Sequence, residues 1–123
     1  MSDCFILLAA GKGKRFKSNT LKQFHRLNGK PLINHSIEKA IKSKIFKEII
    51  IVTNSKIKKP KEKSIKIIKG GSERFKSSKK ALEYIKNRKF KNVFIHDAAR
   101  PNFSIKLLQK LKKELIHNKA VIP

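Results

Sequence analysis

CFILLAAGKG, residues 4–13, is the stretch that decides what fold to expect. Its first seven residues are all apolar, and glycines follow at positions 11 and 13. A continuous apolar run that ends at glycine is typical of a strand buried on both faces of a parallel sheet. We therefore expect a strand over 4–10 that leads directly into a glycine-rich loop.

The rest of the chain alternates between strand-like apolar runs and segments with apolar residues at helical spacing. This alternation indicates an α/β fold with a mainly parallel sheet, which is a Rossmann-like three-layer sandwich. The length suits one compact domain, so residues 1–123 are expected to form part of a single domain. The further predicted strands span 48–53, 64–68, 92–96 and 120–123. The predicted helices span 31–43, 77–87 and 104–117, and Ser104 is expected to cap the last of them.

The cysteine count and the lengths of the apolar runs indicate the cellular compartment. Cys4 is the only cysteine, so an internal disulfide is impossible and a reducing compartment is expected. No apolar run approaches the roughly 18 residues that a membrane span requires. The first apolar run follows Asp3 rather than a positively charged segment, which argues against a signal peptide. We expect a cytoplasmic protein with no membrane partner.

The formal net charge is +24, which has two interpretations. One is binding to a polyanion such as nucleic acid or an anionic membrane. The other is a lysine-biased composition on solvated faces. Only five of the 32 basic residues are arginines, and the lysines are spread along the whole chain. Because arginine is the usual partner for bidentate phosphate and base contacts, we favour the second interpretation and expect no specific nucleic-acid partner.

Three unusual loops follow predicted strands: GKGKRF (11–16), GGSERFKSS (70–78) and HDAARP (96–101). In parallel α/β sheets, ligands bind outside the carboxyl ends of the strands. We therefore expect the three loops to converge on one site.

The first loop has the features of an anion site. Gly11 and Gly13 allow backbone N–H groups to approach an anion closely, and Lys14 and Arg15 add positive charge. A plain glycine turn between a strand and a helix is the alternative.

The other two loops add hydroxyl groups, a carboxylate and an arginine. In 70–78 the glycine pair is followed by the hydroxyl groups of three serines and by Arg74, although a plain turn is again the alternative. In 96–101, Asp97 places a carboxylate at the mouth of the sheet, where it suits a hard cation such as Mg²⁺. Arg100 can hold a phosphate nearby. An aspartate that caps its own loop backbone is the competing interpretation of Asp97.

Four motifs together resemble the 2-C-methyl-D-erythritol 4-phosphate cytidylyltransferases. They are AAGKGKR (9–15), LKQF (21–24), GGSERFKSS (70–78) and HDAARP (96–101), in the family's order and at compatible spacings. The resemblance runs from about Ile6 to the end of the chain. It implies a fold of the nucleotide-diphospho-sugar transferase type. It also implies transfer of CMP from CTP to methylerythritol 4-phosphate with release of pyrophosphate, in non-mevalonate isoprenoid synthesis.

The resemblance also implies roles for individual residues. The reaction would be attack of an acceptor phosphate oxygen on the α-phosphorus of CTP, which needs positioning and charge neutralisation more than a strong base. By position in the motifs, the nucleotide would contact Ala9, Ala10, Gly11, Gly13 and Lys14, and cytosine would be recognised by Gly71, Ser72 and Ser77. Arg15 and Lys22 would stabilise the transition state. Asp97 would bind Mg²⁺, and Arg100 would lie beside the substrates.

Members of this family are nearly twice as long, and their second half supplies the acceptor-binding residues and an arm that builds a homodimer. We therefore expect 1–123 to be the CTP-binding portion of a cytidylyltransferase domain whose C-terminal half is absent, with its activity alone an open question. Two alternatives remain. One is a ribitol-5-phosphate cytidylyltransferase, which shares the fold and much of the loop pattern. The other is an inactive basic nucleotide-binding fragment.

Overall fold

The computed structural model describes residues 3–10, 26–27, 29–55, 57, 62, 64–98, 100 and 102–116. Its main sheet has four parallel strands, as the sequence predicts. In the described part of the chain, no helix is both long and apolar enough to cross a membrane. The strands are β1 (Asp3–Leu8), β4 (Phe46–Thr53), β5 (Ile65–Lys69) and β6 (Asn92–Asp97), in the spatial order β5-β4-β1-β6.

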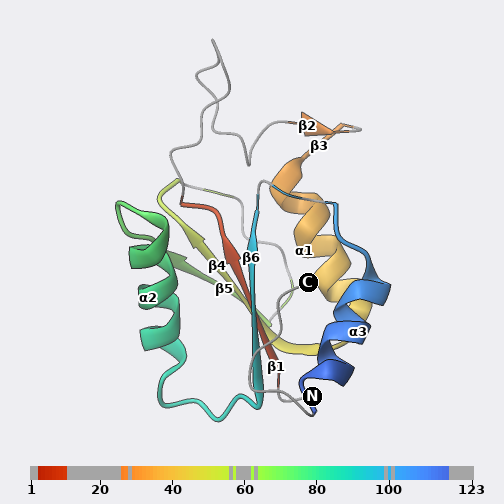
Figure 1. The fold of residues 1–123 in the computed structure, drawn as a ribbon. Coiled ribbons are helices and arrows are strands. Elements are labelled where there is room, and N and C mark those ends of the chain that lie inside the picture. Colours follow the sequence, from red (N-terminus) through yellow and green to blue (C-terminus); the bar gives the residue numbers. More distant parts are fainter. Residues whose placement is uncertain are drawn as a thin grey trace.

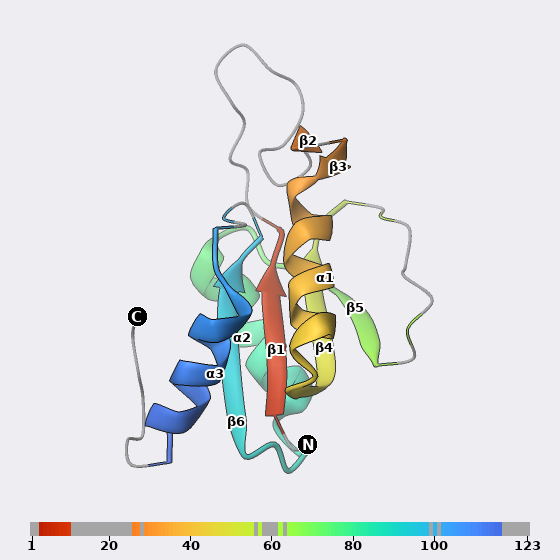
Figure 2. The same ribbon diagram turned by 90° about the vertical axis from the view of Figure 1, so that its right-hand side faces the viewer.

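Helices cover both faces of this sheet, which gives the predicted three layers (Figures 1 and 2). Helices α1 (Leu32–Ser43) and α3 (Ile105–Glu114) lie on one face, and α2 (Arg74–Ile85) lies on the other, at the left in Figure 1. A short antiparallel hairpin of β2 (Arg26–Leu27) and β3 (Lys30–Pro31) leads into α1.

The central strand β1 is buried along its whole length. Successive side chains of a strand point to opposite faces, so Phe5 and Leu7 pack in the core beneath α1 and α3, whereas Ile6 and Leu8 pack beneath α2. Burial of each such side chain contributes roughly 1.5–3 kcal/mol to folding. Because both faces of β1 are covered, its sequence from Cys4 onward is a continuous apolar run instead of an alternating one.

The predicted elements are confirmed with shifts at their ends. Strand β4 begins at Phe46 rather than at 48, and α2 begins at Arg74 rather than at 77. The second half of GGSERFKSS is therefore helical, and only its first four residues form a loop. The Ser104 side chain accepts a hydrogen bond from the Leu107 N–H (3.0 Å) and caps α3, as predicted.

Three further comparisons concern the hairpin and the C-terminal part of the chain. The hairpin β2–β3 was not predicted, although Asn-Gly at 28–29 is a strong hairpin signal and Gly29 has the positive φ (81°) that such turns require. The strand predicted over 120–123 lies outside the described residues. The last helix ends at Glu114 instead of reaching 117.

Candidate functional site

The order of the strands changes direction between β1 and β6. From β1 the chain passes to β4 and β5 on one side, and then through α2 to β6 on the other side. At such a switch point the loops leave toward opposite faces, and a crevice opens outside the carboxyl ends of the strands. The Ala98 N–H donates to the Leu8 carbonyl (2.9 Å), so the residues after β1 and β6 begin side by side.

The Gly70–Gly71 pair brings the end of β5 against this edge. A Cβ on Gly70 would lie 2.8 Å from the Ser77 hydroxyl oxygen and would overlap the Ala10 methyl group. A Cβ on Gly71 would overlap the Lys76 side chain. Neither glycine has a positive φ, so close packing and not backbone conformation requires them. The packing places the second loop beside Ala10 of the first.

The three residues predicted to read cytosine lie together around the start of α2. The Gly71 N–H donates to the Ser77 Oγ (3.0 Å), and Ser77 is buried in the first turn of the helix. Ser72 is exposed, and its Oγ accepts a hydrogen bond from Lys76 Nζ (3.2 Å). The grouping is present, while the contact of these residues with cytosine stays a prediction.

Asp97 ends β6 with its carboxylate at the same edge. Its Oδ2 lies 3.4 Å from Arg74 Nη1 and 3.9 Å from Arg100 Nε. Arg74 is the first residue of α2, so the third and fourth motifs meet through this ion pair. The sequence names Arg74 among the polar residues of GGSERFKSS, but it gives Arg74 no specific role and does not pair it with Asp97. The ion pair depends on how the fold brings the start of α2 to the end of β6, which no local pattern in the sequence shows.

His96 holds the backbone of the loop that carries Arg100. Its Nε2–H donates to the Arg100 carbonyl (2.5 Å), and its ring packs edge-to-face on Phe103, with centroids 4.5 Å apart. Burial lowers the pKa of His96 below its usual 6.5, and the hydrogen bond to Arg100 opposes this shift. The neutral ring with its proton on Nε2 is therefore favoured at neutral pH.

Asn54 is a second residue that sequence reasoning missed. It follows β4, and its side-chain Nδ2 donates to the Ala10 carbonyl (3.4 Å) and to the Gly71 carbonyl (3.1 Å). Asparagine after a strand is common in turns, so nothing in the local sequence marks it. Only the fold brings it between the two loops.

Among the described residues, Asp97 suits a metal ion that is held jointly by the protein and by substrate phosphates. The described residues contain no group of three or more His, Cys, Asp or Glu side chains that could hold a metal ion. Mg²⁺ in nucleotide sites is often held by one or two carboxylates together with substrate phosphates, and the half-buried carboxylate of Asp97 at the sheet edge suits that mode. The predicted residues Gly11, Gly13, Lys14, Arg15 and Lys22 lie outside the described residues.

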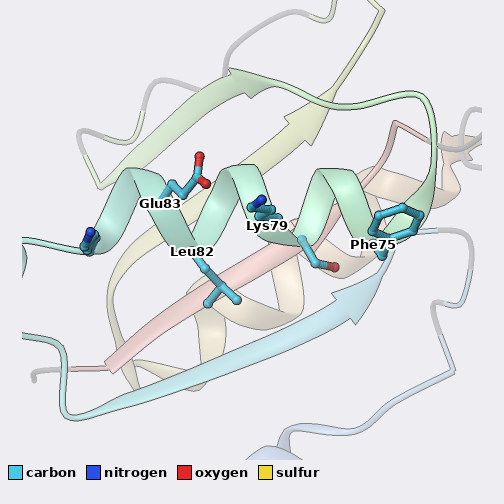
Figure 3. Close-up of a pocket in the computed structure, with 6 residues that line it drawn as sticks. Phe75, Lys79, Leu82 and Glu83 are labelled. Carbon is cyan, nitrogen blue, oxygen red and sulfur yellow. The ribbon is translucent and has the colours of Figure 1, made fainter.

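Two shallow hollows lie along α2. Figure 3 shows the first, with Phe75 at the N-terminal end of the helix and Leu82 and Glu83 farther along. Phe75 is 64% exposed and Leu82 is 45% exposed, and none of the predicted site residues lines this hollow. The second hollow includes Gly71 and Ser72 together with lysines of α2, so it adjoins the predicted cytosine residues.

Comparisons with known proteins agree on one family. The family model of IspD, described as 2-C-methyl-D-erythritol 4-phosphate cytidylyltransferase, matches residues 4–123. The chain is 54% identical to the bifunctional enzyme IspD/IspF of Pelagibacter ubique, with 100% of this chain and 34% of that protein covered. It is 38% identical to the 2-C-methyl-D-erythritol 4-phosphate cytidylyltransferase of Caldicellulosiruptor bescii, with 100% of this chain and 58% of that protein covered.

Solved structures give the same answer. The Francisella tularensis 2-C-methyl-D-erythritol 4-phosphate cytidylyltransferase matches with a TM-score of 0.77 and 32% identity, over 96% of this chain and 54% of that one. The bifunctional IspDF of Campylobacter jejuni matches with a TM-score of 0.77 and 34% identity, over 94% of this chain and 31% of that one. The chain thus spans between 31% and 58% of the length of these four relatives. It belongs to the 2-C-methyl-D-erythritol 4-phosphate cytidylyltransferase family.

Proposed function

We propose that this chain supplies the CTP-binding portion of an enzyme that transfers CMP from CTP to 2-C-methyl-D-erythritol 4-phosphate, with pyrophosphate as the second product. The reaction belongs to the non-mevalonate route to isoprenoid precursors. The single observation that carries the proposal is the convergence of Ala10, Gly71 and Asp97, from three separate motifs, at the switch point of the sheet. Family membership supports it, because the names of the relatives state this activity.

The cytosine end of the nucleotide is assigned to the second loop. Gly71 and Ser77 are joined by a hydrogen bond in which Ser77 Oγ is the acceptor, so the hydroxyl proton of Ser77 can donate to an acceptor on the base. Backbone carbonyls in the same loop can accept from the exocyclic amine of cytosine. Uracil has a carbonyl at that position, so carbonyl acceptors there discriminate against UTP.

The phosphates are assigned to the neighbourhood of Asp97, where β6 ends. Arg100 and Arg74 flank the carboxylate of Asp97 and supply positive charge. Asp97 would hold Mg²⁺, which when bound neutralises charge on phosphate oxygens. Arg15 and Lys22, from the motifs of the first loop, would stabilise the charge that develops as the acceptor oxygen attacks the α-phosphorus and pyrophosphate leaves. We further propose a cytoplasmic enzyme that acts as a homodimer.

Nucleotide selectivity tests the proposal without requiring turnover by a chain shorter than its relatives. Isothermal titration calorimetry with CTP, UTP and ATP, each with and without Mg²⁺, should give tighter binding of CTP and dependence on the metal. Equal binding of all three nucleotides, with an affinity that falls steeply as salt rises, would instead indicate a general polyanion binder and overturn the proposal.

The acceptor is tested separately by pyrophosphate release. The chain is incubated with CTP and Mg²⁺, and methylerythritol 4-phosphate or ribitol 5-phosphate is added in turn. Release with methylerythritol 4-phosphate alone supports the proposed reaction. Release with ribitol 5-phosphate alone would transfer the assignment to the ribitol enzyme.

A further inference from the structure

Asn54 connects two loops that are distant in the sequence. Its amide nitrogen lies 3.1 Å from the Gly71 carbonyl oxygen and 3.4 Å from the Ala10 carbonyl oxygen. A primary amide nitrogen carries two protons, so one side chain can donate both hydrogen bonds at once. We infer that Asn54 is a positioning residue that sets the separation between the loop after β1 and the loop after β5. Its link to cytosine recognition rests on the function proposed above.

The hydrogen bond from Asn54 completes the restraint of the Gly71 backbone. The Gly71 N–H is held by Ser77 Oγ (3.0 Å) and its carbonyl is held by Asn54 (3.1 Å). The preceding carbonyl, of Gly70, accepts a hydrogen bond from Lys80 Nζ (3.2 Å). Glycine is the residue with the largest backbone freedom, so a glycine pair keeps one conformation only where its neighbours restrain it. A restrained loop loses less entropy when a ligand binds.

The backbone that carries Asn54 is itself fixed. The Thr53 hydroxyl accepts a hydrogen bond from the Ser55 N–H (3.1 Å) and donates one to the Ser55 carbonyl (3.4 Å). Thr53 is buried at the end of β4, in the middle of the sheet. The amide of Asn54 therefore acts from a rigid element, which is the arrangement that positions a binding loop well.

The chemistry of the side chain makes the inference specific. In the variants Asn54→Ala and Asn54→Leu, the new side chain cannot donate a hydrogen bond. Leucine has the same branched shape as asparagine, so Asn54→Leu removes the donor with little change of shape. Asn54 is exposed, so neither substitution disturbs the core. Ser55 provides a matched control. The substitution Ser55→Ala changes a side chain in the same turn, but the two hydrogen bonds between the Ser55 backbone and the Thr53 hydroxyl remain.

The experiment has one arm without nucleotide and one arm with it. In the first, ¹⁵N relaxation is measured for Gly71 and Ser72 in the unaltered chain, Asn54→Ala, Asn54→Leu and Ser55→Ala. We expect backbone order parameters to fall from about 0.85 to below about 0.6 in both Asn54 variants and to stay unchanged in Ser55→Ala. In the second, the ratio of CTP to UTP affinity with Mg²⁺ should fall about tenfold in the Asn54 variants, because a loop that is no longer restrained holds its base-reading groups less well in one arrangement.

The two arms distinguish a failure of the positioning role from a failure of the proposed function. Unchanged order parameters in both Asn54 variants would overturn the positioning role. A drop in the order parameters, with an unaltered chain that shows no preference for CTP, would support the positioning role and contradict the proposed function. If the loop loosens and the unaltered chain prefers CTP, an unchanged affinity ratio in the variants would refute the link between Asn54 and base recognition.

Discussion

The two ends of the same sheet present carboxylates in opposite settings. At the amino ends of the strands, Asp3 and Glu48 are buried, and they are paired with Lys112 (3.3 Å) and Arg88 respectively. At the carboxyl ends, the Asp97 side chain is 34% exposed, and the nearest guanidinium nitrogens in its ion pairs lie 3.4 and 3.9 Å away. The first setting holds each carboxylate in a buried ion pair, although Asp3 Oδ2 accepts no hydrogen bond from the described residues, whereas the second leaves the carboxylate partly open to solvent.

Burial thus separates charges that stabilise the fold from charges that a ligand can reach, even in a chain of high net charge. A buried carboxylate that loses its partner is strongly destabilising, because the remaining charge keeps its desolvation cost. An exposed pair contributes only about 0–1 kcal/mol to stability, so its residues can be reoriented by a bound anion or metal at little cost. Substitutions at the two ends should therefore affect different properties.

The largest expected effect is on stability, at the amino end. Arg88 makes two contacts with Glu48, one of them a hydrogen bond from Nη1 to Oε1 at 2.6 Å. We expect Arg88→Ala to lower the free energy of unfolding by about 3 kcal/mol, at the low end for buried pairs because Arg88 itself is partly exposed. Urea unfolding measures the change. Lys89→Ala is the control and should change stability by less than about 0.5 kcal/mol, and an equal loss in both variants would contradict the structural assignment.

The next effect is on ligand binding, at the carboxyl end. We expect Asp97→Asn to change the free energy of unfolding by less than about 1 kcal/mol, because the pairs that it removes are exposed. The same variant should lose the Mg²⁺-dependent gain in CTP affinity, by about tenfold or more. Calorimetric titration with and without Mg²⁺ measures this, with Glu62→Gln, an exposed carboxylate, as the control. A metal response equal to that of the unaltered chain would exclude Asp97 from the metal site.

The smallest effect is a pH dependence at His96. Burial lowers the pKa of His96 below 6.5 in the folded chain, so the unfolded chain binds the proton more tightly. The stability contribution of the neutral ring is complete above pH 6.5 and is lost as the pH falls below it. The nearby charges of Asp97, Arg74 and Arg100 modify the shift less than burial does.

Urea unfolding at pH 7.5 and 5.5 tests this assignment. The loss of stability on acidification should be smaller in His96→Gln, whose amide can still donate to the Arg100 carbonyl but does not titrate. Contributions from the other titrating groups are common to both proteins and cancel in the comparison. Equal losses in the two proteins would remove His96 as a source of the pH dependence.

Local patterns were sufficient for most of the fold. The apolar run of β1, the alternation of strands and helices, and the cap at Ser104 are all properties of neighbouring residues, and each is confirmed. The start of α2 was misplaced because a glycine pair suggests a longer loop. The two glycines are instead required by close packing against Ala10 and Lys76, which no local pattern reveals.

The site was only partly predictable, for the same reason. The motifs located Asp97 and the Gly71 loop, and the order of the strands brings them together. The partners of these residues could not be predicted, because they come from elsewhere in the chain. Arg74 meets Asp97 across 23 positions, and Asn54 meets Ala10 across 44. Such pairs depend on strand order and register, which the apolar pattern of a single sequence does not specify.

The central place of β1 also has a consequence for the order of folding. Asp3, at the start of β1, pairs with Phe46 on one side and with Asn92 on the other. The most apolar strand of the chain is thus made first, and its second neighbour is made last among the four. At typical rates of synthesis this delay is on the order of seconds, during which β6 is not yet available to pair with β1. The pairing of β6 with β1 therefore forms late, by a contact between segments that are distant in the sequence, and such non-local contacts favour slow folding.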